Sequence, residues 1–141
     1  MEMGNRAGVP APPVRPQLPI GEPVVVRMGG GVREFDTDFG KRPTFGIHVY
    51  NYLEGDVGGN VGYHGHVNVF WEAVRAQLGM ALVGSDTLMA CRVLRNGRRY
   101  ELDGLEEAIE TDILQKVEAL IADNDPAREW VPGREDEEAP F

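Results

Sequence analysis

Residues 24–36 read VVVRMGGGVREFD, and this stretch decides how the first half of the chain folds. Val24, Val25 and Val26 are β-branched and favour a strand, whereas the three consecutive glycines that follow tolerate backbone conformations that other residues avoid. The pattern predicts a core strand that ends in a bend or bulge at the glycines. Beyond them, the chain is expected to become an outward loop over residues 29–41.

A phosphate-binding loop is the competing interpretation of these glycines, because a strand followed by a glycine-rich turn is how such loops begin. A dinucleotide fingerprint would need a third glycine where Glu34 stands, a Walker loop would need Gly-Lys-Ser/Thr, and both need a helix next. Asp36 and Asp38 follow instead, and their carboxylates would repel an anion. Nucleotide binding by this stretch is therefore not expected.

Length, composition and charge restrict the class of protein. The chain has 141 residues, enough for one ordinary domain, and its 18 glycines and 10 prolines indicate a large share of loops. The formal net charge is −9: residues 1–48 carry six Lys/Arg and five Asp/Glu, whereas residues 49–141 carry eight and eighteen. This balance argues against a protein that grips duplex DNA, but it allows a surface along which DNA slides.

Cys91 is the only cysteine, so no disulfide can form within the chain, and its apolar neighbours predict a buried position in a strand. No apolar run reaches the roughly 20 residues that a membrane-spanning helix needs, and the first residues lack the apolar core of a secretory signal. We expect a soluble product made in the cytoplasm, with no cofactor and no membrane partner.

Three regions are predicted along the chain. Residues 1–23 contain six prolines and are expected to form an extended arm, which either lies along a neighbouring subunit or is disordered. Residues 24–125 are expected to form a single domain. Residues 126–141 form a C-terminal acidic tail that includes the charged run Arg134-Glu-Asp-Glu-Glu138.

Two further elements are predicted in the middle of the chain. Residues 42–52, RPTFGIHVYNY, alternate like a half-buried strand, with Phe45, Ile47 and Val49 on one face and His48, Tyr50 and Tyr52 on the other. The glycine-rich residues 53–65 are expected to form a loop. Apolar residues at helical spacing then predict an amphipathic helix over residues 66–82.

The last third of the chain predicts a hairpin and a second helix. Strands over residues 88–94 and 98–102 flank Asn96-Gly97, a dipeptide typical of type I′ turns. An amphipathic helix is expected over residues 104–123, with Asp103 as its N-cap and Glu106 as the capping-box partner. Together these elements predict an α+β fold, in which a small, mostly antiparallel sheet of about four strands packs against two amphipathic helices.

His64 and His66 are the residues that most resemble a metal site. On a strand, His-x-His places two imidazoles about 6–7 Å apart on one face, and Glu72 or His48 could add a ligand. Five positions resemble the first motif of cupins: Gly58, His64, His66, Glu72 and Gly79. The spacing from His66 to Glu72 departs from that motif, and no histidine follows to complete a second one. No metal ligand or catalytic residue is therefore assigned, and the histidines are expected in a loop at the start of the helix.

Four arginines surround the predicted turn and form the only basic cluster in the acidic part of the chain: Arg92, Arg95, Arg98 and Arg99. Such a tip can contact nucleic acid or the acidic face of another subunit. The net charge and the lack of interleaved aromatic residues favour a subunit contact. The candidate subunit-interface residues are these four arginines together with Gly29, Gly30, Gly31 and Arg33.

Three segments occur in a characteristic order: Pro23-Val-Val-Val-Arg-Met-Gly-Gly-Gly31, Lys41-Arg-Pro-Thr-Phe-Gly-Ile-His-Val-Tyr50 and Phe70-Trp-Glu-Ala-Val-Arg-Ala-Gln-Leu78. In this order they resemble the tail terminator family of actinobacterial siphophages, over roughly residues 15–84. The chain departs from the family's usual pattern in two ways. It lacks an amphipathic helix before the Pro-rich segment, and its Gly/His loop at residues 55–66 is longer.

The resemblance implies a non-enzymatic bacteriophage protein that forms a ring, commonly a hexamer, on the last ring of the tail tube. Such a ring stops tube growth and joins the tail to the head. The implied partners are further copies of the chain, the tail-tube protein and a head-completion or neck protein, while genome DNA passes through the channel without sequence-specific binding. The protein would be made in the bacterial cytoplasm and reside in the neck of the virion.

Two other functions remain open at this point. One is a small metal-binding, cupin-like enzyme that uses His64 and His66. The other is an adaptor whose Pro-rich arm and acidic tail bind a partner that the sequence does not identify.

Overall fold

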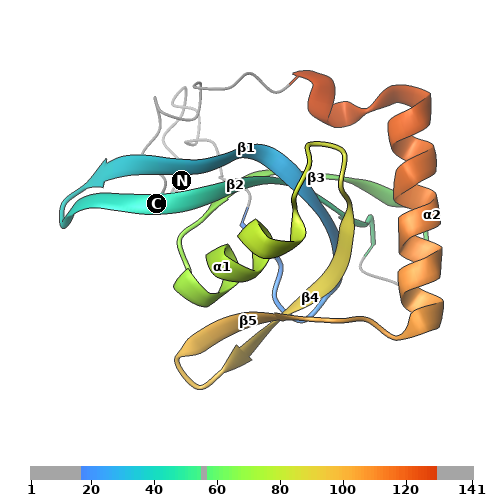
Figure 1. The fold of residues 1–141 in the computed structure, drawn as a ribbon. Helices are drawn as coiled ribbons and strands as arrows, with labels where there is room; N and C mark the ends of the chain where they lie inside the picture. Colours follow the sequence, from blue (N-terminus) through green and yellow to red (C-terminus); the bar gives the residue numbers. More distant parts are fainter. Residues whose placement is uncertain (1–16, 55–56, 130–141) are drawn as a thin grey trace, which may run out of the picture.

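The computed structural model describes residues 17–54 and 57–129, which form one five-stranded antiparallel sheet with helices on both sides (Figure 1). The strands are β1 (Pro23–Thr37), β2 (Gly40–Tyr52), β3 (Val61–Val69), β4 (Met89–Asn96) and β5 (Arg99–Asp103). The helices are α1 (Glu72–Ala81), α2 (Glu107–Asn124) and the short 3-10 helix η1 (Pro126–Glu129). The predicted α+β class is confirmed, with five strands in place of about four.

Strand β1 lies at the centre of the sheet, whose order is β3-β2-β1-β4-β5. It pairs with β2 along nearly its whole length but with β4 only over residues 23–26, and β2 pairs with β3 only over residues 45–52. Residues 32–44 therefore form a two-stranded hairpin that projects beyond the rest of the sheet (Figure 1). We call this hairpin the β-arm.

The three glycines were predicted to end the strand at a bend or bulge. In the structure they form a bulge inside β1, and the strand continues beyond them. Met28 pairs with Ile47 and Gly31 with Gly46, so two residues of β1 have no counterpart on β2. Gly30 and Gly31 have φ angles of 106° and 71°, at which a side chain would be strained. The predicted outward loop is a continuation of the strand, because its residues find partners on β2.

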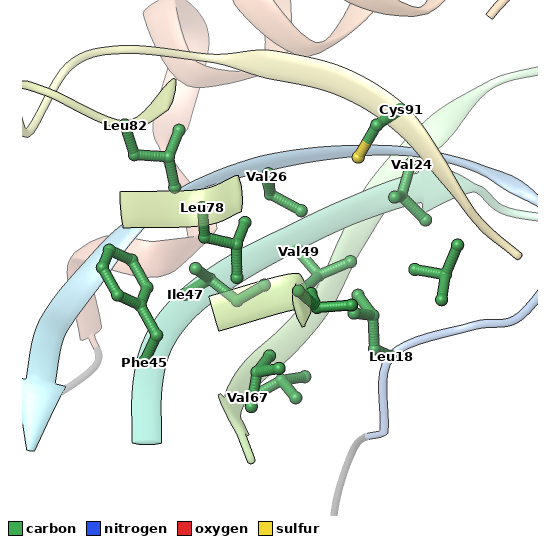
Figure 2. Packing of buried hydrophobic residues seen from close by; sticks show 13 residues of the cluster. Leu18, Val24, Val26, Phe45, Ile47, Val49, Val67, Leu78, Leu82 and Cys91 are labelled. Atoms are coloured by element: carbon green, nitrogen blue, oxygen red, sulfur yellow. The ribbon is translucent and has the colours of Figure 1, made fainter. Parts of the chain in front are cut away.

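Each face of the sheet is covered by one helix. Helix α1 packs on the face to which Ile47 and Val49 point, with Leu78 among the buried contacts (Figure 2). Helix α2 covers the opposite face, where Val117 packs in the same core as Tyr50. The alternation predicted for β2 is therefore confirmed.

The packed region extends past the predicted domain limits of residues 24 and 125. Leu18 is buried in the core under α1, and Gly21 donates a backbone hydrogen bond to the carbonyl of Val93 (2.7 Å). Ala127 in η1 is also buried. The rest of the predicted N-terminal arm and of the acidic tail lies outside the described residues.

Cys91 is buried in β4, as predicted. Burial raises the pKa of its thiol to about 12, so the group stays protonated at neutral pH. Across the described residues, none of the helices is both long enough and apolar enough to cross a membrane.

The predicted helix over residues 66–82 is wrong in its first part. Residues 61–69 form β3, and α1 begins only at Glu72. Val67 and Val69 point into the core because side chains alternate along a strand. Their spacing in sequence from the apolar residues of α1 matches a helical period only by coincidence.

The predicted loop over residues 53–65 is shorter than expected, because β3 already begins at Val61. Glycine is a weak strand former, but two glycines of β3 have specific reasons to be there. Gly62 leaves room for the side chain of Leu53, and Gly65 has a φ of 145° at a β-bulge.

The hairpin of β4 and β5 is confirmed, but its turn lies one residue later than predicted. Asn96 pairs with Arg99, so Gly97 and Arg98 are the central residues. Gly97 has a φ of 67°, and no non-glycine residue in the described part of the chain has a positive φ. A type I′ turn needs positive φ at both central positions, so the predicted turn type is wrong.

Helix α2 confirms the second predicted helix, but its start differs. The N-cap is Glu106, which makes no side-chain capping hydrogen bond. Asp103 pairs with Arg92 in the ladder of β4 and β5, which removes it from the start of the helix. The predicted capping box of Asp103 and Glu106 is therefore wrong.

Candidate functional site

A group of polar side chains lies on the sheet face that α2 covers, where β1, β2 and β3 run side by side. We call it the polar cluster, and its members are Arg27, His48, Tyr50, Tyr63, His66 and Asp125. Five of them come from the three strands, while Asp125 follows the last residue of α2. The cluster therefore joins the sheet to the helix layer.

Arg27 and Asp125 form the charged part of the cluster. Their side chains are only 13% and 12% exposed, and Nη2 of Arg27 lies 2.7 Å from Oδ2 of Asp125. Tyr50 donates its hydroxyl to Oδ1 of the same carboxylate (3.1 Å), as does the backbone N–H of Ala127 (3.0 Å). Burial opposes ionisation of Asp125, but the hydrogen bonds from Arg27, Ala127 and Tyr50 outweigh it, so the pKa of the carboxyl is lowered.

The two histidines of the cluster lie edge to face, with ring centroids 5.3 Å apart. Nδ1 of His48 lies 2.9 Å from the hydroxyl oxygen of Tyr63, and Nε2 of His66 donates to the carbonyl of Gly29 in the β1 bulge. Because a carbonyl oxygen only accepts, this contact places a hydrogen on Nε2 of His66. His66 thereby connects the edge strand β3 to the root of the β-arm.

Two glycines make room for the imidazole rings. A Cβ at Gly29 would lie 2.8 Å from Cδ2 of His66 and 3.0 Å from Nε2 of His48. A Cβ at Gly46 would lie 3.0 Å from Nε2 of His66. Beside them, Oδ1 of Asn68 is buried and has no hydrogen-bond partner among the described residues. The rings therefore pack directly on the backbone of β1 and β2.

Burial favours the neutral form of both histidines. It lowers the pKa of His48 to about 4, with His66 and Arg27 adding to the effect against Asp125. Burial also lowers the pKa of His66, although the hydrogen bond to Gly29 opposes this. At neutral pH the charges within the cluster are therefore those of Arg27 and Asp125.

The stability of the protein should fall as the pH drops from 6.5 to 4. In the unfolded chain a histidine takes up a proton near its usual pKa of 6.5, whereas folded His48 stays neutral down to about pH 4. Proton binding therefore favours the unfolded state across this window, by up to about 3 kcal/mol from His48. Urea unfolding at a series of pH values measures this slope.

His48→Gln should flatten the slope between pH 6.5 and 4, whatever it does to stability at pH 7. Gln115→Ala changes an exposed residue of α2 that does not titrate, so it should keep the wild-type slope. An equal slope in wild type and His48→Gln would show that His48 is protonated in the folded state as readily as in the unfolded chain.

The structure separates the two histidines of the predicted metal motif. Both lie on β3 and not in a loop, but His64 is the extra residue of a β-bulge, because Tyr63 pairs with Tyr50 and Gly65 with Val49. His64 donates to the carbonyl of Gln17 (2.6 Å), whereas His66 belongs to the polar cluster. Glu72 lies in the first turn of α1. Within residues 17–54 and 57–129, no three His, Cys, Asp or Glu side chains are grouped so as to hold a metal ion.

Two strongly exposed apolar side chains lie on the β-arm. Phe39, at its tip, is 85% exposed, and Val32, near its root, is 74% exposed. The two strands of the β-arm pair only with each other. Val32 pairs with Phe45, a residue of the core under α1, whereas Phe39 lies at the far end of the hairpin, so the two exposed side chains mark the root and the tip of the β-arm.

The predicted interface residues at the root of the β-arm have different environments. Gly29 and Gly31 are buried, whereas Gly30 between them is exposed. Arg33 is half-buried, and its guanidinium lies 5.4 Å from the ring centroid of Phe35. Gly29 and Gly31 thus shape the interior of the fold, and the exposed surface of the β-arm is formed by other residues.

Three of the four predicted arginines are exposed at the turn of β4 and β5, and we call them the arginine tip: Arg95, Arg98 and Arg99. Nε of Arg95 donates to the carbonyl of Gly97 (3.0 Å), and its guanidinium lies 5.8 Å from the ring centroid of Tyr100. Tyr100 in turn stacks on Trp71, with centroids 3.8 Å apart and planes within 11°. Aromatic rings that the sequence did not lead us to expect therefore support the tip.

The fourth arginine is engaged by a residue of its own chain. Nη1 of Arg92 lies 3.5 Å from Oε1 of Glu106, the residue before α2. Its Nε is buried and has no partner in the part of the chain that the structure describes. Arg92 is therefore set apart from the arginine tip.

Similarity to known proteins does not assign a function to this chain. No protein-family model, curated protein or solved structure matches it. The β-arm, the arginine tip and the polar cluster therefore carry the functional argument.

The polar cluster is the main feature that sequence reasoning missed. The alternation of residues 42–52 predicts His48 and Tyr50 on one strand face, but it does not predict the groups that surround them. The sequence does contain weak signals, since Arg27 directly follows three valines and Asp125 precedes a proline, where a carboxylate often accepts from a nearby backbone N–H. Neither signal indicates that residues 98 positions apart form an ion pair.

Proposed function

We propose that this chain is a non-enzymatic virion protein, a siphophage tail terminator that assembles into a ring at the end of the tail tube and joins the tail to the head. The observation that carries the proposal is the β-arm, a hairpin that leaves the body of the sheet and exposes Phe39 and Val32. The resemblance of residues 15–84 to the tail terminator family supplies the kind of assembly.

A projecting hairpin with exposed apolar side chains gains stability when it packs on a neighbouring chain. A two-stranded hairpin is marginally stable in water, and each Å² of apolar surface that it buries contributes about 25 cal/mol. A β-arm placed on the body of the next subunit joins two different surfaces. Such head-to-tail contacts add each subunit to the next in the same way. The series closes into a ring when the rotation between neighbouring subunits permits.

The partners follow from the proposed place in the virion. One face of the ring would contact the tail-tube protein, and the other a head-completion or neck protein. With a net charge of −9 per chain, a channel through the ring would repel the phosphates of the passing genome and not retain them. The polar cluster supports a structural role, because Arg27, Asp125 and His66 are engaged with one another or with the backbone.

The experiment compares the mass of the wild-type protein with that of a β-arm variant, Val32→Thr/Phe39→Ser. The wild type should form a ring, commonly of six subunits, and the variant should remain monomeric at the same concentration. Since both side chains are exposed, the free energy of unfolding of the monomer should change by less than about 0.5 kcal/mol. Light scattering after size-exclusion chromatography gives the mass, and urea unfolding gives the stability.

A matched control alters two apolar side chains that are equally exposed but lie outside the β-arm. Met80 and Val83 are each 82% exposed, so Met80→Ser/Val83→Thr changes a similar apolar area. This variant should assemble like the wild type. Wild-type protein that stays monomeric at high concentration, or virions whose necks are not labelled by an antibody to this chain, would contradict the proposed function.

A further inference from the structure

We propose that the arginine tip of one copy docks on the acidic outer surface of α2 in the next copy. This inference rests on the proposed function, because it names a second contact of the same ring. It concerns surfaces that are remote from the β-arm, so each contact can be tested without changing the other.

The arginine tip presents positive charge that the subunit does not neutralise. Arg98 and Arg99 are exposed and form no ion pair with any described residue. Arg95 is held by the carbonyl of Gly97 and by the Tyr100 ring, so the turn is supported from within. Guanidinium groups fixed at a turn favour a surface with several carboxylates.

Helix α2 presents negative charge that is also unpaired. Glu107, Glu110 and Glu118 are exposed, and none of them forms an ion pair within the described residues. Spacings of three and eleven residues place the three carboxylates on one side of the helix. The only basic residue of α2, Lys116, is engaged by Asp112 and by the backbone carbonyls of Gly58 and Gly59, which lie between β2 and β3.

The two surfaces cannot meet within one subunit. Strand β5 lies between the turn and α2, and its five residues span about 16 Å at 3.3 Å per residue. Figure 1 shows the turn of β4 and β5 and helix α2 at different sides of the subunit. Arg92, at the other end of the hairpin, does reach Glu106, which is the intramolecular form of the same pairing.

A second copy of the chain is the occupant that charge favours. The hairpin carries four arginines on a chain whose net charge is −9, so any other copy offers an acidic surface. Nucleic acid would be repelled by the rest of the subunit. Because the tip and α2 are different surfaces, their contact is head-to-tail and is compatible with a closed ring.

Reciprocal charge reversal tests the contact. Arg98→Glu/Arg99→Glu and Glu107→Arg/Glu118→Arg should each weaken self-association, with a rise in the dissociation constant on the order of tenfold at low salt. A 1:1 mixture of the two variants should assemble again, because every reversed tip then faces a reversed helix in alternating order. Sedimentation at low and high salt measures the three samples, and the wild-type association should weaken as salt is added.

The control is Arg128→Glu, which reverses an exposed charge in η1 and should leave association unchanged. If the β-arm variant abolishes the ring but both charge reversals assemble like the wild type, this inference is overturned while the proposed function stands. Wild-type protein that forms no ring would contradict the proposed function, and the inference that rests on it. Loss of binding to a short DNA duplex in Arg98→Glu/Arg99→Glu, with assembly intact, would assign the tip to nucleic acid and overturn the inference.

Discussion

Replacing Gly46 with alanine should strongly destabilise the fold. The new Cβ would lie 2.6 Å from the carbonyl oxygen of Gly29, 3.0 Å from Nε2 of His66 and 3.2 Å from Oδ1 of Asn68. The closest of these atoms belongs to the backbone and accepts the hydrogen bond of His66, so it cannot move without breaking the cluster. We expect a loss of about 3 kcal/mol or more in the free energy of unfolding, measured by urea denaturation.

Gly79→Ala provides the matched control. Gly79 lies within α1, and a Cβ there would meet only Cε2 of Phe45, at an ordinary contact distance of 3.9 Å. Alanine has the higher helix propensity, so this variant should gain about 0.5–1 kcal/mol. A Gly46→Ala variant within about 0.5 kcal/mol of the wild type would mean that β1 and β2 separate easily at this point.

Arg27→Met should cost about 3–5 kcal/mol of stability. The substitution leaves the Asp125 carboxylate buried, with only Tyr50 and the backbone N–H of Ala127 as donors. Asp125→Leu should cost a similar amount, because it leaves the guanidinium of Arg27 unpaired. The double variant should be more stable than the sum of the two losses predicts, since it buries no single charge.

The surface pair Lys41–Asp36 is the control for this ion pair. Its atoms are 4.0 Å apart, and the side chains are 71% and 86% exposed. Lys41→Met should therefore change stability by less than about 0.5 kcal/mol. If Arg27→Met changed stability as little as Lys41→Met, the end of α2 would not depend on its ion pair with the sheet.

Most of the fold is encoded in local patterns. The valines of β1, the alternation of β2, the hairpin of β4 and β5 and the apolar stripe of α2 each predict their element. Strand β3 was not predicted because its glycines are typical of a loop. Gly62 is required because the side chain of Leu53 occupies the space that a Cβ would need, and no local pattern in the sequence indicates this contact. The bulge was anticipated, but not that the strand continues beyond it.

The candidate surfaces were predictable only where they depend on neighbours in sequence. The arginine tip needs nothing more than a two-residue turn, so its residues could be named in advance. The polar cluster needs the register of three strands, a bulge at Gly65 and the end of a helix that follows much later in the chain. His64 and His66 illustrate the difference, because one inserted residue in the ladder gives them separate partners.

The position of strand β1 would have a mechanical consequence in the proposed ring. Strand β1 forms one side of the β-arm and is also the central strand, held by β2 on one edge and by β4 on the other. Tension applied through the β-arm therefore acts along a strand whose two ladders must slide together, whereas an edge strand would peel away one hydrogen bond at a time. The glycine bulge between the β-arm and the core lies next to the contact of His66, which ties it to a third strand. A pull transmitted through the β-arm would thus be shared among the strands at the glycine bulge, where side chains constrain the backbone least.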